Sequence, residues 1–164
     1  MTDRIREVTM DDLERVTEVE AVCFPAAEAA GRESFQDRIR SFSDSFFVAE
    51  KDGQIVGFIN GAVTDERTIR DEMFEDVSLH DPKGNYQSIF GLDVVPQWQH
   101  MGIAGELMEH MIKEARRKGR KGLILTCKER LIGFYERFGY KNLGVSRSVH
   151  GGAVWYDMIL EFEG

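Results

Sequence analysis

The sequence predicts an α/β protein in which a mixed β-sheet carries helices on both faces. Residues 87–95, 103–118 and 122–127 follow one another as strand, helix and strand, a spacing that predicts two parallel strands joined by a helical crossover. Residues 46–50 and 54–63 predict two further strands, and the Asp-Gly pair between them is typical of a tight hairpin. The predicted order is βααββ, a long loop, and then βαβαββ.

The first part of the chain predicts one short strand and two helices. Residues 4–8 form the strand, and Thr9 followed three positions later by Asp12 has the spacing of a capping box that starts a helix. That helix reaches Cys23, and Pro25 helps to end it. Its apolar stripe consists of Leu13, Val16 and Val19. A second helix is expected over residues 34–42, with Phe35, Ile39 and Phe42 on one side.

A long polar connection, residues 64–85, separates the hairpin from the central strand. Residues 69–74 predict a helical turn within it, and residues 81–85 predict a chain reversal. Connections of this length inside a compact domain often have a function.

The rest of the chain predicts a long helix, a short helix and three strands. Apolar residues recur at four-residue spacing along the long helix and are expected to face the sheet: Ile103, Leu107, Met111 and Ala115. The short helix spans residues 130–138, and Gly139 after it fits the left-handed position that closes a helix. Final strands are expected over residues 142–148 and 154–162.

Composition indicates a single globular domain over residues 1–164, since 42% of the residues are apolar and 30% are charged. The net charge of −8 argues against nucleic acid as the main partner. An acidic surface favours cationic small molecules or basic peptides through weak electrostatic steering.

The two cysteines, Cys23 and Cys127, lie far apart in sequence and form neither a metal-binding spacing nor a disulfide framework. No two histidines share a ligand spacing, so the sequence predicts no bound metal. The first four residues lack an apolar signal core, and no apolar run approaches the length of a membrane span. We therefore expect a cytoplasmic protein that is not inserted in a membrane.

A glycine-bearing turn at the start of the long helix predicts an anion site. The turn consists of Gln99, His100, Met101, Gly102, Ile103, Ala104 and Gly105. The first N–H groups of a helix lack internal partners, and the helix dipole adds positive potential there. No Lys-Ser/Thr pair follows the last glycine, which excludes a Walker loop. An ordinary loop-to-helix junction is the alternative interpretation.

This turn resembles the pyrophosphate-binding segment of GNAT-type N-acetyltransferases, and other segments resemble the same family. Residues 92–94 precede the turn as the family's central strand does, and residues 126–140 end in FYERFGY, similar to the family's FYxxFGF/Y signature. Residues 18–25 and 56–61 resemble the arylalkylamine (serotonin-type) branch in its bacterial form. The resemblance implies a GNAT-like acyl-CoA N-acyltransferase fold, with splayed parallel strands and acetyl-CoA as co-substrate.

The family resemblance assigns the cofactor contacts to main-chain groups. Leu92, Asp93 and Val94 would pair with the pantetheine arm like an added strand, and residues 99–105 would hold the pyrophosphate. A backbone N–H near Val94 would stabilise the oxyanion of the tetrahedral intermediate.

Tyr135 is the candidate general acid, because the matching tyrosine of the family faces the thioester sulfur. A side chain of this type would protonate the departing thiolate. The alternative is that Tyr135 is a core aromatic beside Phe134, Phe138 and Tyr140, since aromatics at helical spacing are usually buried.

The general base is not carried over from the arylalkylamine branch. Ser88 and Phe90 stand where that branch has two histidines on the central strand, and neither side chain can accept a proton as a base. The candidates that remain are Glu28, Asp93 and His80, each acting through water. The alternative for Glu28 is a solvated loop carboxylate, and for Asp93 a side chain that points to solvent.

Phe24, Pro25 and Glu28 are expected to contact the acceptor, from their placement alone. The resulting prediction is an N-acetyltransferase that moves acetyl from acetyl-CoA to a primary amine of a small molecule, by direct attack in a ternary complex. One alternative is a protein N-terminal or lysine acetyltransferase, and another is a non-catalytic acyl-CoA-binding protein. In such folds the exposed final strands often pair subunits, which would make a homodimer.

Overall fold

The computed structural model describes residues 2–163 and divides into two compact units. The first comprises Met1–Gly61 and Gly91–Met111, and the second Ala62–Phe90 and Ile112–Gly164. The predicted single domain over residues 1–164 includes Met1 and Gly164, which lie outside the described residues, and it remains a prediction.

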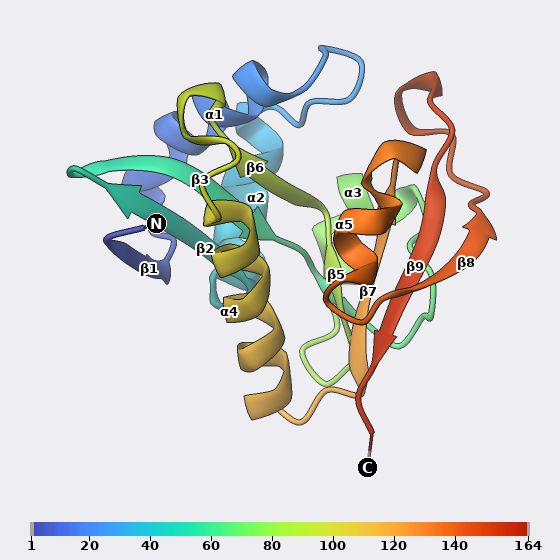
Figure 1. The fold of residues 1–164 in the computed structure, drawn as a ribbon. Helices are drawn as coiled ribbons and strands as arrows, with labels where there is room; N and C mark the ends of the chain where they lie inside the picture. The colour runs from blue at the N-terminus through green and yellow to red at the C-terminus, as the bar shows by residue number, and fades with distance from the viewer. Residues whose placement is uncertain (1, 164) are drawn as a thin grey trace. The chain divides into compact units, whose positions relative to one another are not determined.

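The first unit is built on an antiparallel sheet with the strand order β1-β2-β3-β6 (Figure 1). The strands are β1 (Arg4–Glu7), β2 (Phe46–Lys51), β3 (Gln54–Asn60) and β6 (Gly91–Val94). Asp52 and Gly53 join β2 to β3 with φ angles of 53° and 77°, so the predicted hairpin is confirmed. Residues that reach positive φ readily make this tight reversal possible.

Helices cover both faces of this first sheet. The helices of this unit are η1 (Met10–Asp12), α1 (Leu13–Cys23), α2 (Arg32–Phe42), η2 (Ser43–Ser45), η4 (Pro96–Trp98) and α4 (Ile103–Arg117), of which α4 runs on into the second unit. On one face Phe58 of β3 packs edge-on against Phe35 of α2, with ring centroids 5.5 Å apart. On the opposite face Phe47 of β2 packs against His110 of α4, at 4.5 Å. The predicted stripe of α4 is buried along its length, from Ile103 to Ala115.

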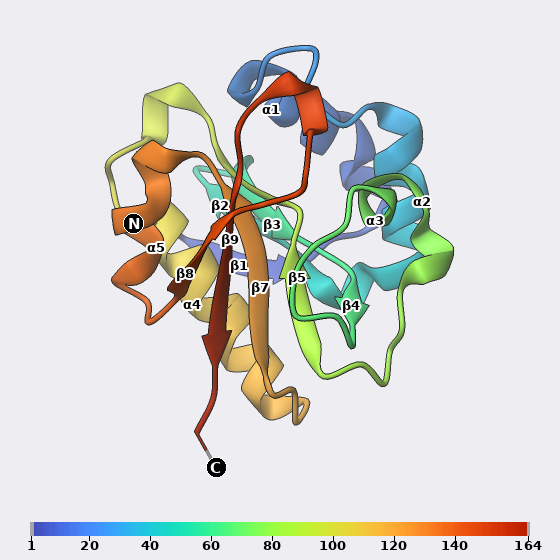
Figure 2. The same cartoon turned by 90° about the vertical axis from the view of Figure 1, so that its right-hand side faces the viewer.

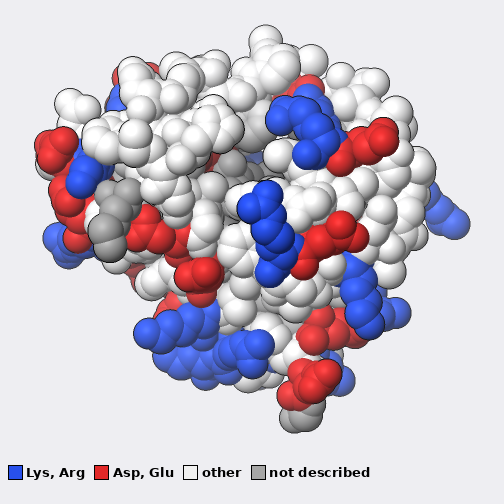
Figure 3. All heavy atoms as spheres, viewed as in Figure 1, with Lys and Arg blue, Asp and Glu red and all other residues white. Residues whose placement is uncertain are grey.

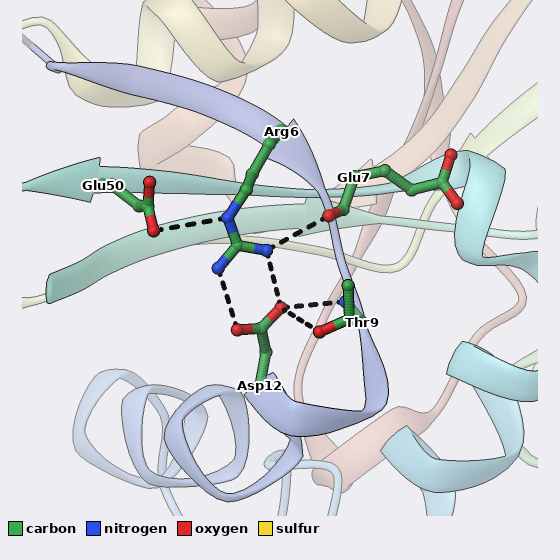
Figure 4. Close-up of polar contacts among 5 residues, drawn as sticks. All are labelled: Arg6, Glu7, Thr9, Asp12 and Glu50. Atoms are coloured by element: carbon green, nitrogen blue, oxygen red, sulfur yellow. Dashed lines mark hydrogen bonds and ion pairs between the residues drawn. The ribbon is translucent and has the colours of Figure 1, made fainter. Parts of the chain in front are cut away.

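A guanidinium network ties the first strand to the first helix (Figure 4). Arg6 of β1 donates to both carboxylate oxygens of Asp12, at 2.8 and 2.9 Å, and to Glu50 of β2 at 3.3 Å. The main-chain N–H of Thr9 donates to the same Asp12 carboxylate at 2.8 Å, which confirms the predicted capping box. One carboxylate therefore caps the helix and neutralises the arginine.

The second unit is built on a five-stranded mixed sheet with the order β4-β5-β7-β9-β8 (Figure 2). The strands are β4 (Val63–Thr64), β5 (Tyr86–Ile89), β7 (Gly122–Cys127), β8 (Lys141–Val145) and β9 (Tyr156–Glu161). β5 and β7 are parallel and the other pairs are antiparallel, so the predicted parallel pair is confirmed.

Short helices accompany this sheet: α3 (Glu72–Glu75), η3 (Val77–Leu79), η5 (Glu129–Leu131), α5 (Ile132–Glu136) and η6 (His150–Gly152). Ile69 lies buried with Tyr86, Ile124 and Ile159, which form a hydrophobic cluster on one face of the sheet. The helix predicted over residues 130–138 is a 3-10 turn followed by α5. Gly139 after it has φ of 103°, as its predicted left-handed position requires.

Two predicted strands are each divided between the two sheets. Residues 54–63 form β3 in the first sheet and β4 in the second, and residues 87–95 contain β5 in the second and β6 in the first. Gly61 and Gly91 stand at the two changes of partner, but a glycine within a strand pattern does not by itself predict a change of sheet. The predicted α/β fold with a mixed sheet is confirmed, but the pairing makes two sheets where one was expected, and only the second contains the parallel pair.

Charges of both signs are interspersed on the face shown in Figure 3. Basic side chains gather where α4 ends with Arg116 and Arg117. This placement fits a solvated helix end. Among residues 2–163, no helix is long and apolar enough to cross a membrane.

Candidate active site

Strand β6 lies at an edge of the first sheet and offers main-chain groups for pairing. The Val95 N–H donates to the Val56 oxygen at 2.9 Å, and Asp93 lies opposite Phe58. Because hydrogen-bonded pairs alternate along antiparallel strands, Leu92 and Val94 direct their N–H and C=O groups away from β3. The Val94 oxygen already accepts from the side chains of Gln99 and Cys23, so the edge offers the Leu92 groups and the Val94 N–H to an extended molecule that carries amides.

The predicted anion turn follows this edge strand directly. His100 and Gly102 have φ angles of 64° and 85°, so the chain turns twice through the left-handed region before α4 begins at Ile103. The Gln99 side chain donates to the Val94 oxygen at 2.9 Å and fixes the turn to β6. Consecutive N–H groups at such a turn and helix start make a binding site for anions.

The ten residues predicted to bind the cofactor all lie in the first unit. Three are in β6, namely Leu92, Asp93 and Val94. Gln99, His100, Met101 and Gly102 form the turn, and Ile103, Ala104 and Gly105 begin α4. The residues predicted to bind the pantetheine and those predicted to bind the pyrophosphate therefore follow each other closely in the chain and belong to one unit.

The predicted acceptor residues Phe24, Pro25 and Glu28 lie in the loop between α1 and α2, in the same unit. The N–H groups of Glu28 and Ala29 both donate to the Pro25 oxygen at 2.9 Å, which makes this loop a tight turn. Phe24 and Glu28 are half-buried and Pro25 is exposed. The Cys23 thiol at the start of the loop donates to the Val94 oxygen of β6, at 3.3 Å.

Tyr135 belongs to α5 in the second unit. Its ring is buried and meets Phe134 and Tyr140 edge-on, with centroids 5.1 and 5.8 Å away. Burial, with a smaller contribution from Tyr135, raises the pKa of Tyr140 well above its usual value. Tyr135 thus has the packing of a core aromatic, and that packing would also hold a general acid in one orientation.

The side chains at the two histidine positions of the arylalkylamine branch are engaged in the second unit. Ser88 is buried, and its hydroxyl donates to the Ala62 oxygen at 2.6 Å. The Phe90 ring lies 4.9 Å from that of Phe74. His80, one of the three candidate bases, accepts the Val63 N–H on Nδ1 at 2.9 Å, and this bond holds the ring against the backbone.

The interpretation of Asp93 as a side chain in solvent is wrong, because Asp93 is 1% exposed. Its side chain lies on the face of the first sheet that α1 and α2 cover, together with Asn60 of the neighbouring strand. Glu20 of α1 and Arg38 of α2 are also buried. Local sequence patterns do not identify these three neighbours of Asp93, and the one signal they offer is a polar residue at an apolar position of each predicted element.

No group of three His, Cys, Asp or Glu side chains within residues 2–163 could hold a metal ion. Both cysteines are free thiols. Burial raises the pKa of Cys127 to about 11, and burial with the nearby Glu20 charge raises that of Cys23.

Comparison with known proteins agrees with the fold described above. The chain is 28% identical over 130 residues to the probable hydrolase YhcX of Bacillus subtilis (strain 168), and it spans about a quarter of the length of that curated relative. A solved structure of the GNAT-like decarboxylase GphF in complex with isobutyryl-CoA superposes with a TM-score of 0.84 at 22% identity. That match covers 96% of this chain and 98% of the other.

The ribosomal-protein-S18-alanine N-acetyltransferase of Escherichia coli has the same fold, with a TM-score of 0.73 at 19% identity over 98% of this chain and 96% of the other. The profile of the Acetyltransferase (GNAT) family matches residues 12–140, which include parts of both units. Since this match covers most of the sequence, the chain belongs to the GNAT acetyltransferase family.

Proposed function

We propose that this protein transfers an acyl group, in the first instance acetyl, from coenzyme A to a primary amine by direct attack in a ternary complex. The observation that carries the proposal is the continuous path from the edge strand β6 through the left-handed turn to α4. The edge groups of Leu92 suit an amide of a pantetheine arm, and residues 99–105 suit a pyrophosphate. The GphF structure, whose bound molecule is isobutyryl-CoA, supports a coenzyme A thioester as the donor.

The reaction requires an oxyanion donor and a proton for the leaving thiolate. The Val94 N–H, directed to the open edge of β6, is our candidate for the oxyanion contact. The amine nitrogen forms a bond to the thioester carbon, the C–S bond breaks, and Tyr135 gives its proton to the sulfur. A thiol has a pKa near ~8.5, as in cysteine, so the thiolate leaves readily and Tyr135 accelerates a step that is already feasible.

The proton of the amine goes to water or to Glu28, which is half-buried in the proposed acceptor loop. Ser88 and Phe90 do not supply the histidine relay of the arylalkylamine branch, so membership of that branch rests on the resemblance of residues 18–25 and 56–61. We therefore place small primary amines in general, and not arylalkylamines in particular, as the first acceptors to test.

A protein N-terminus is the second candidate acceptor. The fold similarity to the S18-alanine N-acetyltransferase and the net charge of −8, which favours basic peptides, support it. A non-catalytic acyl-CoA-binding protein remains as the third possibility from the sequence.

The experiment is a screen for coenzyme A release, with acetyl-CoA and isobutyryl-CoA as donors against a panel of small amines and a panel of peptides. Acetylation of small amines supports the proposal, and acetylation of peptides alone would replace it with the second candidate. Tight acyl-CoA binding without turnover on either panel would leave the non-catalytic function. If the protein does not bind coenzyme A, all three candidate functions (small-amine acetylation, peptide acetylation and non-catalytic acyl-CoA binding) are refuted.

A further inference from the structure

Four polar side chains from four elements meet in the interior of the first unit. Glu20 of α1, Arg38 of α2, Asn60 of β3 and Asp93 of β6 are 7%, 4%, 0% and 1% exposed. Burying a charge costs several kcal/mol unless it is paired and hydrogen-bonded. Two carboxyl groups and one guanidinium in such a place therefore require a specific arrangement of protons.

The two carboxyl groups face each other over Gly91. A methyl group added at Gly91 would lie 3.2 Å from Asp93 Oδ1 and 3.8 Å from Glu20 Oε1, so both oxygens converge on one point. Within residues 2–163, Glu20 Oε1 and both Asp93 oxygens have no donor when both groups are ionised. A single proton on Asp93 turns this contact into a hydrogen bond to Glu20, which gives a partner to Glu20 Oε1 and to one of the two Asp93 oxygens.

The charges also balance with one shared proton. Arg38 Nη1 donates to Asn60 Oδ1 at 3.1 Å, and both carboxyl groups act on the guanidinium electrostatically. Burial lowers the pKa of Arg38 to about 10, against the raising effect of these carboxylates, so Arg38 is charged at neutral pH. Burial, followed by the charge of Glu20, raises the pKa of Asp93 well above its usual value. One negative charge on the pair then meets one positive charge on Arg38.

The second oxygen of Glu20 holds the loop between α1 and α2. Glu20 Oε2 accepts the Ala30 N–H at 2.9 Å, near the end of the loop. The start of the same loop is held by Cys23, whose thiol donates to the Val94 oxygen. Both ends are thus linked to β6, through Cys23 directly and through Glu20 by way of Asp93.

We propose that Glu20 and Asp93 share one proton, and that this hydrogen-bonded pair positions residues 24–30 to receive the acceptor amine beside β6. The proposal rests on the proposed function in assigning this loop to the acceptor. Glu20 and Asp93 are positioning residues, because their side chains are buried and act through the loop.

A rise in pH that removes the shared proton leaves two carboxylates facing each other beside one guanidinium. The groups around the Glu20–Asp93 pair are Cys23 of α1, Arg38 of α2 and Asn60 of β3, and Arg38 is the one cation among these three. Repulsion then pushes Glu20 from Asp93 and loosens its bond to Ala30. The KM for the acceptor should rise at alkaline pH while the KM for acyl-CoA stays constant.

The test compares two variants. Asp93→Ala removes the hydrogen-bond donor to Glu20, whereas the amide N–H of Asp93→Asn replaces the shared proton at every pH. Glu18→Gln is the matched control, because Glu18 is an exposed carboxylate on the same helix that pairs with Arg15. Amide hydrogen exchange of residues 24–31 is measured without any substrate, from neutral to alkaline pH. The KM and kcat for acceptor and donor are measured with the best amine from the screen.

We expect Asp93→Ala to raise exchange at Ala30 and the acceptor KM by about tenfold, the effect of losing one hydrogen bond to a charged group. Donor KM should stay within about twofold, as expected when no donor contact is lost. Asp93→Asn should match the wild type at neutral pH and lose the alkaline rise, and Glu18→Gln should change nothing.

Unchanged exchange at Ala30 in Asp93→Ala, or an equal rise in both KM values, would overturn the proposal. If Asp93→Ala does not fold, the pH profile of loop exchange in Asp93→Asn decides, and a profile identical to that of the wild type would overturn it. If no amine is acetylated, the proposed function fails, and the exchange measurements still decide whether the shared proton holds the loop.

Discussion

The Gln99 side-chain amide donates to the main-chain oxygen of Val94 at 2.9 Å, and this bond joins the anion turn to the strand that precedes it. In the proposed function, the strand holds the pantetheine and the turn holds the pyrophosphate of one ligand, so the spacing between strand and turn should affect donor binding. We expect Gln99→Ala to raise the KM for acyl-CoA by roughly 2- to 10-fold, the value of one neutral hydrogen bond. Steady-state kinetics with varied donor measure this effect, and an unchanged donor KM would remove Gln99 from the site.

Tyr135→Phe should lower kcat by about 10²- to 10⁴-fold, the usual contribution of a positioned acid, while coenzyme A binding persists. The phenyl ring retains the edge-on contacts with Phe134 and Tyr140, so folding is expected to be unaffected. Tyr140→Phe is the matched control, because it removes a buried hydroxyl from the same aromatic cluster. Equal losses in the two variants would assign Tyr135 a packing role only.

His100 and Gly102 test whether the turn acts through its backbone. Gly102 has φ of 85°, and within residues 2–163 no atom beyond its chain neighbours lies within 4 Å of an added Cβ, so Gly102→Ala is opposed by backbone strain and not by a clash. That strain is about 1–2 kcal/mol, which predicts a donor KM about 5- to 30-fold higher. His100→Gly should keep the donor KM, since glycine adopts φ of 64° without strain. A large loss of donor binding in His100→Gly would show that the imidazole contributes a contact of its own.

Acid should weaken the network around Arg6. Burial raises the pKa of Asp12, but hydrogen bonds from Arg6 and Thr9 outweigh burial and hold it below its usual value. A carboxyl whose pKa is depressed by folding stabilises the protein above its unfolded pKa, and loses that contribution as pH falls through the folded pKa. Asp12→Asn should therefore lower the free energy of unfolding at neutral pH by about 1–3 kcal/mol, and by much less at about pH 2. Urea unfolding at both pH values measures the difference, and a constant loss at both would contradict the electrostatic explanation.

Cys23 can report the charge on Glu20 without any enzyme assay. Burial and Glu20 raise the pKa of the Cys23 thiol, so less reactive thiolate is present at neutral pH. Glu20→Gln removes the charge and should accelerate alkylation of Cys23. Cys127, buried in the second unit with a pKa of about 11, is the internal control and should stay slow. Equal acceleration at both cysteines would indicate general loosening of the protein.

Much of the fold could be predicted because local patterns are sufficient for it. The Asp52-Gly53 hairpin, the Thr9–Asp12 cap, the buried stripe of α4 and the left-handed Gly139 all depend on neighbours in the chain. The strand partners could not be predicted in the same way. Residues 87–95 have the pattern of one strand, yet β5 pairs with β7 and β6 pairs with β3.

The candidate site likewise has a part that local sequence patterns predict and a part that depends on long-range packing. Its main-chain part, β6 and the turn, follows from the residues that form a strand, a tight turn and a helix start. The shared proton could not be foreseen, because Glu20 and Asp93 are 73 positions apart in the numbering, and a polar residue at an apolar position does not identify its partner.

By itself, the sequence determined which segments are helices, strands and turns, and that a glycine-bearing turn precedes a long amphipathic helix. Only the tertiary structure decided which strands pair, and that Asp93 is enclosed beside Glu20, Arg38 and Asn60. The physical reason is that periodicity sets the face on which a side chain lies, whereas long-range packing determines what covers that face and therefore which proton a buried carboxyl must keep.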